Sequence, residues 1–226
     1  MPLNWSTTQK EGAIHGVKIL VYGRAGTGKT TLCGTAPSPL IISAEAGLLS
    51  LRSKNIPVIL VSSLQDVVDA YLWCQTSARQ YGVRTICMDS ISEITEKVLA
   101  THRAKTKDGR AAYGDMAIEA VSLVKSFRDL AGFHVVVTAK ETTTVDNITG
   151  ATRTGPSTPG RRVGEDLPYL FDIVLQTGIS QNQQTGVPFH YLRTSPTPTI
   201  EAKDRSGALA PFEAPDLTHI FAKLGV

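Results

Sequence analysis

The sequence Gly23-Arg24-Ala25-Gly26-Thr27-Gly28-Lys29-Thr30 directly follows the apolar run 17–22. It matches the pattern G-x-x-x-x-G-K-[ST] in full and stands between an expected strand and an expected helix, as a phosphate-binding loop requires. Glycines let the backbone curve so that its N–H groups surround phosphate oxygens, and the start of the helix adds positive partial charge. The stretch therefore predicts a nucleoside triphosphate site. The alternative is a glycine turn with an incidental lysine.

The expected nucleotide-binding residues are this motif and its next neighbour. They are Gly23, Arg24, Ala25, Gly26, Thr27, Gly28, Lys29, Thr30 and Thr31. Lys29 would reach the β- and γ-phosphates, and the Thr30 hydroxyl would ligate Mg²⁺. Asp89 ends the apolar run 85–88 and would accept a hydrogen bond from a water on the same ion. Capping of the next expected helix by Asp89 would be compatible with that role.

A further carboxylate, Glu45, lies just beyond the apolar run 40–43. Hydrolysis needs a group that activates or orients the attacking water. A carboxylate at the end of a strand near Asp89 could face the γ-phosphate. The spacing alone fits a solvated loop glutamate equally well.

Apolar runs alternate with stretches of helical periodicity over much of the chain. We expect strands at 17–22, 40–43, 58–61, 85–88 and 135–138, and helices after Ser63, at 91–105 and at 115–131. Apolar strands that alternate with helices indicate a parallel sheet covered on both faces. Residues 142–166 predict a long loop, 172–176 and 189–193 a C-terminal antiparallel edge, and 215–224 a short helix. We therefore expect a single α/β domain, residues 17–226, after a flexible or edge segment, residues 1–16.

The composition excludes several classes of protein. Of 226 residues, 42% are hydrophobic and 19% charged, which is typical of a globular chain rather than a disordered or fibrous one. The net charge of +3 permits a polyanionic partner without requiring one. We find no run long enough to span a membrane, no secretory signal in residues 1–16, and only scattered cysteines. These features predict a cytoplasmic protein without a membrane partner.

The phosphate-binding loop, Glu45 in an Ala-Glu-Ala context and the strand ending Met88-Asp89-Ser90 together resemble the RecA-like P-loop ATPase core. The resemblance covers residues 17–205. It implies a mostly parallel central sheet flanked by helices, with ATP and Mg²⁺ as ligands. In that family the carboxylate at the position of Glu45 activates water. The position of the γ-phosphate sensor, which is glutamine in that family, falls here on Thr138 or Lys140.

A cationic element, Lys203-Asp204-Arg205-Ser206-Gly207, follows the expected C-terminal strands. Residues two apart on an extended segment project to the same side. Lys203 and Arg205 are similar to the fingers that ring-forming RecA-like helicases insert into a neighbour's ATP site, where cations stabilise transition-state charge. The resemblance implies a homo-oligomer, either a ring or a short filament. The alternative is a solvated turn with an internal ion pair.

Two segments concentrate positive charge. The first, 101–113, supplies Arg103, Lys105, Lys107, Arg110 and the aromatic Tyr113. The second, 147–164, supplies Arg153, Arg161 and Arg162 and contains no acidic residue. By position both resemble the DNA-binding loops of the RecA-like core, and mobile basic loops suit a site that follows a single strand. Two solvated loops without a ligand are the alternative.

The size and the motif order look most like the core-only RecA-like ATPases of bacteriophages, which act in single-strand annealing and recombination. This resemblance implies ATP hydrolysis stimulated by single-stranded DNA, a location in the host cytoplasm, and a single-strand-binding protein as a candidate partner. Two other activities stay open: a small P-loop kinase for a nucleotide or metabolite, and a replicative helicase-like ATPase. Phosphate transfer to an acceptor would identify the kinase, and unwinding would identify the helicase.

Overall fold

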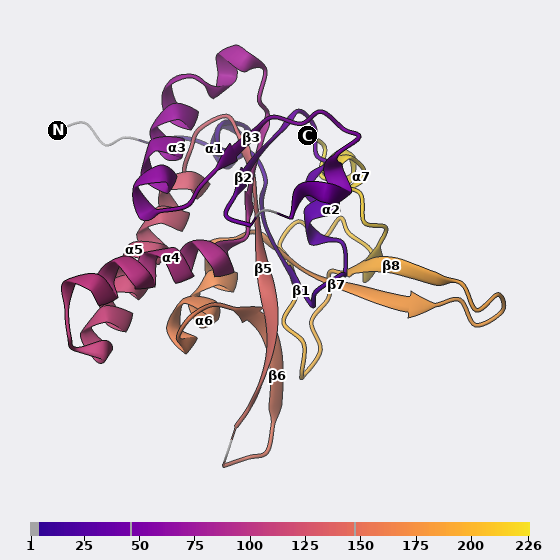
Figure 1. The fold of residues 1–226 in the computed structure, drawn as a ribbon. Coiled ribbons are helices and arrows are strands. Elements are labelled where there is room, and N and C mark those ends of the chain that lie inside the picture. The colour runs from indigo at the N-terminus through magenta and orange to yellow at the C-terminus, as the bar shows by residue number, and fades with distance from the viewer. Residues whose placement is uncertain (1–4, 46, 147) are drawn as a thin grey trace.

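The computed structural model describes residues 5–45, 47–146 and 148–226. Within these residues a ten-stranded sheet has the order β10-β8-β7-β1-β5-β4-β2-β3, with β6 on β5 and β9 on β7 (Figure 1). The strands are β1 Lys18–Gly23, β2 Pro39–Ser43, β3 Val58–Leu60, β4 Thr85–Asp89, β5 His134–Val145, β6 Thr152–Ser157, β7 Ile173–Gln181, β8 Pro188–Arg193, β9 Lys203–Asp204 and β10 Phe212–Glu213. The six neighbouring strands from β7 to β3 are parallel, and β8 pairs antiparallel with β7.

Helices cover both faces of this sheet. They are α1 Thr8–His15, α2 Lys29–Cys33, α3 Leu64–Thr76, α4 Ile91–Lys105, α5 Gly109–Arg128, α6 Arg161–Leu170 and α7 Leu217–Lys223, with short 3₁₀ turns η1 Leu48–Leu51 and η2 Ala78–Tyr81. None of the described helices is long and apolar enough to cross a membrane.

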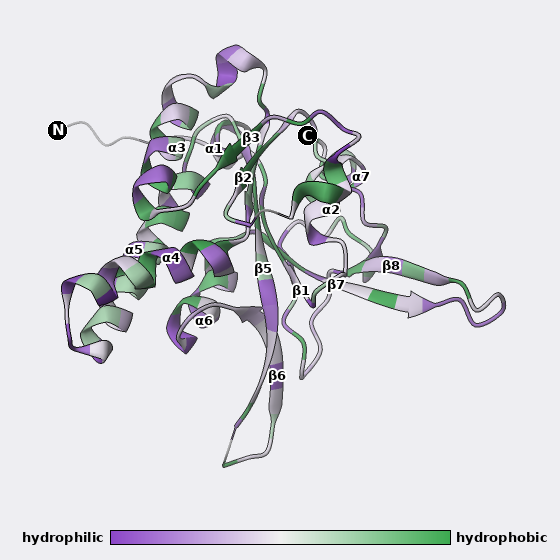
Figure 2. Cartoon of the chain, in the orientation of Figure 1, coloured by the Kyte–Doolittle hydropathy of each residue, from purple (hydrophilic) through white to green (hydrophobic). Residues whose placement is uncertain are grey.

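Alternate residues of the central strands enter two separate cores, because successive side chains of a strand point to opposite faces. Leu20 and Tyr22 pack with α3, α4, α5 and α6, whereas Ile19 and Val21 pack with α2 and α7. Figure 2 shows hydrophobic residues along the central strands and on α2. The predicted α/β class, with a mostly parallel sheet and antiparallel C-terminal strands, is confirmed.

The prediction of a long loop at 142–166 is wrong. Strand β5 continues to Val145 and pairs with β6 from Lys140 opposite Ser157 to Val145 opposite Thr152. The ribbon extends away from the body, so much of its surface is polar and exposed, and no apolar alternation marks it in the sequence (Figure 1). Helix α6 then begins at Arg161 and buries Val163 and Leu167.

Three smaller expectations also need correction. The N-terminal segment contains α1, which Thr7 caps by accepting from the Lys10 N–H. Helix α5 begins at Gly109 instead of 115, because Asp108 caps it, and it ends at Arg128. Strand β3 lies at the sheet edge and is half-exposed, whereas we expected a buried strand.

Candidate nucleotide-binding site

The glycine-rich loop joins β1 to α2 at the carboxyl edge of the parallel strands. Gly26 and Gly28 have φ angles of +78° and +90°, a region that side-chain-bearing residues rarely adopt. The loop borders a cavity of about 580 Å³. Its lining residues are Gly23, Arg24, Ala25, Gly26, Gly28, Lys29, Thr30, Thr31, Glu45, Gly47, Ser50, Asp89, Lys140 and Glu141. One cavity thus brings together the loop and three carboxylates, Glu45 just beyond β2, Asp89 at the end of β4 and Glu141 within β5.

The Lys29 ammonium lies against its own loop. Its Nζ donates to the carbonyl oxygens of Gly23 and Arg24, each at 2.9 Å. Burial lowers the pKa of Lys29, and the carboxylates of Asp89 and Glu45 act in the opposite direction. A bound phosphate would add to the negative charge that keeps this ammonium protonated.

A chain of three oxygen-bearing side chains lies beside Lys29. The Thr30 hydroxyl donates to Asp89 Oδ2 at 2.6 Å, and the Thr138 hydroxyl donates to Asp89 Oδ1. Asp89 is 4% exposed, so both of its oxygens are held in place. Thr138, an expected γ-phosphate sensor, therefore contacts Asp89 and does not line the cavity. Paired hydroxyl and carboxylate oxygens are the hard donors that suit Mg²⁺ together with phosphates and waters.

Glu45 lines the cavity from the end of β2. Its Oε1 accepts from the Ser90 hydroxyl at 2.8 Å, and Ser90 follows Asp89 directly. The residue that orients Glu45 therefore directly follows Asp89 at the end of β4. This location agrees with a group that contacts water near the terminal phosphate, the role expected of Glu45.

Lys140, the other expected sensor, also lines the cavity. Its ammonium forms an ion pair with Glu93 in the first turn of α4, and that hydrogen bond raises the pKa of Lys140. Next to it stands Glu141, which was not predicted from the sequence. Glu141 Oε2 accepts from the Gln176 side chain at 2.9 Å. If the strand expected at 135–138 had been extended to residue 141, Glu141 would have been placed on a strand facing the phosphate-binding loop.

Residues of β7 and β8 also support the loop, and no sequence signal pointed to them. The Thr27 and Thr177 hydroxyl oxygens are 2.6 Å apart, and His190 Nδ1 donates to the Thr27 carbonyl oxygen at 3.2 Å. A Cβ on Gly23 would lie 2.0 Å from Thr177 Oγ1. The C-terminal antiparallel strands therefore pack directly against the back of the phosphate-binding loop.

We expect Gly23→Ala to destabilise the protein and to weaken nucleotide binding. The added methyl group would overlap Thr177 Oγ1 and also lie 2.9 Å from the Thr177 carbonyl oxygen. Overpacking of this kind costs about 1–3 kcal/mol. Urea denaturation would measure the change in the free energy of unfolding. The control is Gly109→Ala, where nothing lies within 4 Å of the new Cβ. Equal stability of the two variants would contradict the tight junction.

The expected fingers lie away from this cavity. Lys203 pairs with Val174 in the β9–β7 ladder, and its ammonium donates to the Pro168 carbonyl oxygen at the end of α6. Arg205 contacts Asp172 at 3.2 Å, at the amino end of β7. Neither cation reaches the phosphate-binding loop of its own chain. Arg205 is the freer of the two, because its ion pair is exposed.

The expected first DNA-binding segment is mostly helical instead of a mobile loop. Arg103 and Lys105 belong to the last turn of α4, Lys107 lies in the connection, and Arg110 and Tyr113 belong to α5. In the second segment, Arg161 and Arg162 open α6. Asn147, where that segment begins, lies outside the described residues.

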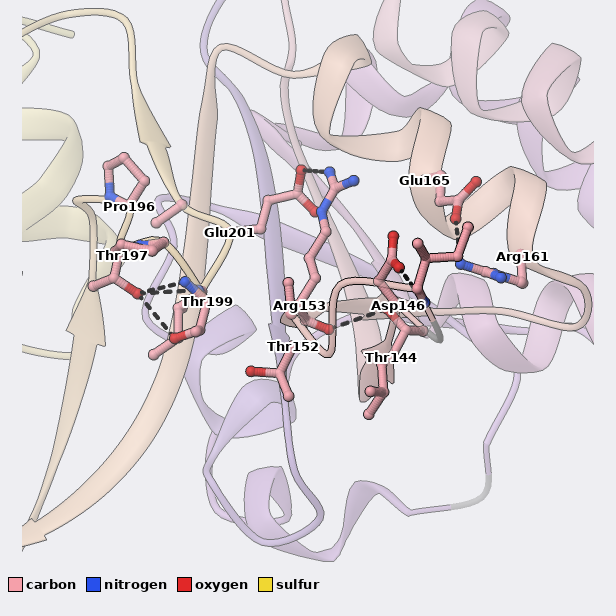
Figure 3. A pocket seen from close by; sticks show the side chains of 16 residues that line it. Thr144, Asp146, Thr152, Arg153, Arg161, Glu165, Pro196, Thr197, Thr199 and Glu201 are labelled. Atoms are coloured by element: carbon pink, nitrogen blue, oxygen red, sulfur yellow. Dashed lines mark hydrogen bonds and ion pairs between the residues drawn. The ribbon is translucent and has the colours of Figure 1, made fainter.

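Acidic groups from outside the second segment pair with its arginines, Glu201 through a tertiary contact and Glu165 and Asp166 through i,i+4 contacts along α6. Arg153 forms an ion pair with Glu201, and Arg161 with Glu165 (Figure 3). Arg162 lies 3.8 Å from Asp166. The Arg153–Glu201 and Arg161–Glu165 pairs line a cavity of about 740 Å³ between the β5–β6 ribbon, α6 and residues 196–202. The local positive charge is thus smaller than the sequence suggests.

A phosphate-binding loop between β1 and α2, with Thr30 and Asp89 in contact beside it, defines a P-loop NTPase. The sequence profile described as AAA domain matches residues 15–206. The chain therefore belongs to the AAA domain family of nucleotide-binding proteins. The prediction that this protein is a P-loop NTPase is therefore confirmed.

Two solved structures are similar to this chain. A KaiC-like protein from the hyperthermophilic archaeon Pyrococcus horikoshii OT3 is 14% identical, with 79% of this chain and 78% of that chain covered and a TM-score of 0.43. The flagellar accessory protein FlaH from Methanocaldococcus jannaschii is 13% identical, with 84% of each chain covered and a TM-score of 0.44. No curated protein matches the chain significantly.

Proposed function

We propose that this protein is an ATPase that binds single-stranded DNA and acts in phage annealing or recombination, with each ATP site completed by a second copy of the chain. The observation that carries the DNA proposal is the meeting of the two basic segments. Tyr113 of α5 lies against Gly160, just before α6, where an added Cβ would be 3.3 Å from the ring. Segments far apart in sequence thus form one surface.

The composition of this surface supports binding of a single strand. The Arg103 guanidinium lies 5.3 Å from the centre of the Tyr113 ring and donates to its hydroxyl at 3.0 Å. A cavity of about 250 Å³ lies between Tyr113, Arg161 and Arg162. Aromatic faces stack on bases without regard to sequence, and arginines neutralise phosphates. The ion pairs of Arg161 and Arg162 are exposed and therefore weak, so a polyanion can compete for both cations.

A short hydrogen-bonded path joins this surface to the nucleotide cavity. The Ser92 hydroxyl accepts from the Lys140 backbone N–H at 2.8 Å and donates to the Ser157 carbonyl oxygen. Lys140 lines the cavity, and Ser157 ends the strand that leads to Gly160. If Lys140 moves when the nucleotide binds, the Ser92 side chain would therefore transmit that movement to the basic surface.

The residues around the cavity would have separate roles in ATP hydrolysis. The loop N–H groups and Lys29 would bind the phosphates, and Thr30 and Asp89 would hold Mg²⁺ with its waters. When bound, Mg²⁺ neutralises charge on the transferred phosphate. Glu45 would accept a proton from the attacking water, with its carboxylate oriented by Ser90. Arg205 of a neighbouring copy would stabilise the charge that develops in the transition state.

We expect Tyr113→Ala to weaken single-stranded DNA binding by about 1–3 kcal/mol, the usual contribution of one stacked base. Replacing Arg161 and Arg162 together with alanine should reduce the slope of log K against log salt by roughly 0.7 for each phosphate that the protein no longer neutralises. Fluorescence anisotropy with a labelled oligonucleotide at several salt concentrations would measure both effects, with a non-hydrolysable ATP analogue present.

Two exposed residues just before the amino end of β4, Tyr81 and Arg84, provide matched controls. Replacing either residue with alanine should leave the DNA affinity unchanged. Binding that does not depend on salt, or equal losses in the control variants, would contradict the proposed surface. A phosphorylated small-molecule acceptor would instead indicate a kinase, and strand separation a helicase.

A further inference from the structure

Strands β7 and β8 continue beyond the rest of the sheet as a projecting hairpin (Figure 1). Strand β1 pairs with β7 only as far as Gln176, and β10 pairs with β8 at Leu192 and Arg193. Residues 178–191, which we call the arm, extend beyond these pairings, and their two strands pair with each other. A two-stranded hairpin is marginally stable by itself in water, so the role of the arm depends on what its faces contact.

The two faces of the arm differ, because successive side chains of a strand point to opposite sides. Ile179 of β7 pairs with His190 of β8, so their side chains share one face. Nearer the body, the paired residues Thr177 and Leu192 lie on the same face. The Thr177 hydroxyl contacts Thr27 of the phosphate-binding loop, and Leu192 packs in the core beside α2. The face of Ile179 and His190 is therefore the one next to the phosphate-binding loop.

His190 holds this face of the arm against the loop. Its Nδ1 donates to the Thr27 carbonyl oxygen at 3.2 Å, and the ring would lie 3.6 Å from a Cβ on Gly28. Because a carbonyl oxygen can only accept a hydrogen bond, Nδ1 carries the proton and this hydrogen bond orients the ring. Ile179 is 49% exposed and lies across the ladder from His190, which is also exposed. An imidazole ring and a branched aliphatic side chain thus form an exposed surface beside the loop.

The composition of the arm suits an uncharged, flat ligand. The sequence contains no Asp, Glu, Lys or Arg between Gln176 and Arg193, although 19% of the whole chain is charged. Phosphate groups are bound by cations or by inward-pointing backbone N–H groups, and the glycine-rich loop already provides both. Bases instead stack on aromatic rings, and ligand pockets are mostly apolar with few polar groups. The arm therefore fits the nucleoside part of a nucleotide better than its phosphates.

The sheet order indicates which way a bound triphosphate would run. Asp89 ends β4 and Glu45 follows β2, and both strands lie beyond β5 on one side of β1. The groups that would hold Mg²⁺ and contact water act at the γ-phosphate, so this end of the triphosphate belongs on that side. Strands β7 and β8 lie on the other side of β1. The nucleoside, at the opposite end of the triphosphate, would therefore leave the loop toward the arm.

We infer that the base of the bound nucleotide stacks on the face of the arm formed by Ile179 and His190. The glycine-rich loop binds phosphates and does not distinguish one base from another, so the arm would supply this selectivity. Purines bury more ring surface than pyrimidines when they stack, which favours ATP and GTP over CTP and UTP. The inference rests on the nucleotide site alone and is independent of the proposed DNA binding.

Isothermal titration calorimetry with Mg²⁺ would compare a non-hydrolysable ATP analogue with inorganic tripolyphosphate, which has no base. The wild-type protein should bind the ATP analogue more tightly. His190→Ala should weaken binding of the analogue about 5- to 150-fold, the usual effect of losing one stacking contact, and leave tripolyphosphate binding unchanged. His190→Phe keeps an aromatic ring but loses the donor to Thr27, and it should retain most of the affinity for the analogue.

Two further variants test which face of the arm is used. Ile179→Ala shortens the partner of His190 on the loop side and should also weaken binding of the ATP analogue alone. Phe189→Ala is the matched control, because it removes a 48% exposed ring from the neighbouring position of β8, whose side chain lies on the opposite face. It should leave both affinities unchanged. In competition, GTP should displace the analogue from the wild-type protein at lower concentration than CTP or UTP.

The comparison of the two ligands separates contact with the base from support of the loop. Equal losses for both ligands in His190→Ala would overturn the inference, because His190 would then act only by holding the loop. Equal affinity of the wild-type protein for both ligands, or equal competition by GTP, CTP and UTP, would overturn it as well. A folded wild-type protein that binds neither ligand would contradict the nucleotide site itself. Absence of DNA binding or of ATP turnover would instead contradict the proposed function and leave this measurement valid.

Discussion

Replacing Lys29 with alanine should reduce ATP turnover by at least about 10²- to 10³-fold, the effect of removing one group that stabilises developing charge. The Lys29 ammonium belongs to the phosphate-binding loop and faces a cavity that Asp89, Glu45 and Glu141 also line, and all three carboxylates interact electrostatically with it. Without it, one fewer cation would offset the repulsion between these three carboxylates and the triphosphate. Phosphate release with and without single-stranded DNA would measure turnover, and calorimetry would measure binding.

The matched control is Lys125→Ala on α5, far from the cavity lining. It removes the same charge from the chain and should leave turnover unchanged. If Lys29→Ala kept wild-type turnover, the nucleotide would have to bind elsewhere. The assignment of the cavity beside β1 and α2 would then be wrong.

Glu45→Gln should preserve ATP binding and reduce turnover by about 10²- to 10⁴-fold, the usual contribution of a general base. Glutamine keeps the size of the side chain and can still contact the Ser90 hydroxyl, but it cannot accept a proton from water. Calorimetry should therefore report unchanged or tighter binding while phosphate release falls. The separation of the two effects distinguishes a chemical role from a binding role.

Glu141→Gln is the sharpest control for that variant, because Glu141 lines the same cavity from the other side and has a similar single partner, Gln176. A much smaller effect of Glu141→Gln on turnover would support the role of Glu45. If Glu141→Gln abolished turnover and Glu45→Gln did not, the catalytic carboxylate would be the one on β5, and the sequence-based assignment would fail.

The local sequence was sufficient to predict the centre of the nucleotide site, which consists of the phosphate-binding loop and Asp89. The phosphate-binding loop is a contiguous motif whose glycines, lysine and threonine have fixed roles, so its position between β1 and α2 followed directly. Asp89 was found because a buried parallel strand is apolar throughout, and the first charged residue after it marks its carboxyl end. Ser63 likewise indicated the start of α3, where the side chains of Ser63 and Asp66 form both hydrogen bonds of a capping box.

Other parts of the molecule gave no such local signal. The β5–β6 ribbon is solvated on much of its surface, so its strands lack the apolar alternation that identifies half-buried strands. Glu141 was missed because β5 was expected to end at residue 138. Thr177 and His190 reach the phosphate-binding loop only because β7 is paired with β1, which joins residues about 150 positions apart in sequence.

The order of residues along the chain thus determined the fold class and the phosphate-binding loop, because short-range backbone preferences and strand apolarity are properties of neighbouring residues. Only the folded arrangement decided that Tyr113 meets Gly160, that Glu201 neutralises Arg153, and that Arg205 lies away from its own loop. Electrostatic and packing interactions depend on distance in space, and that distance is set by the pairing of strands far apart in the chain.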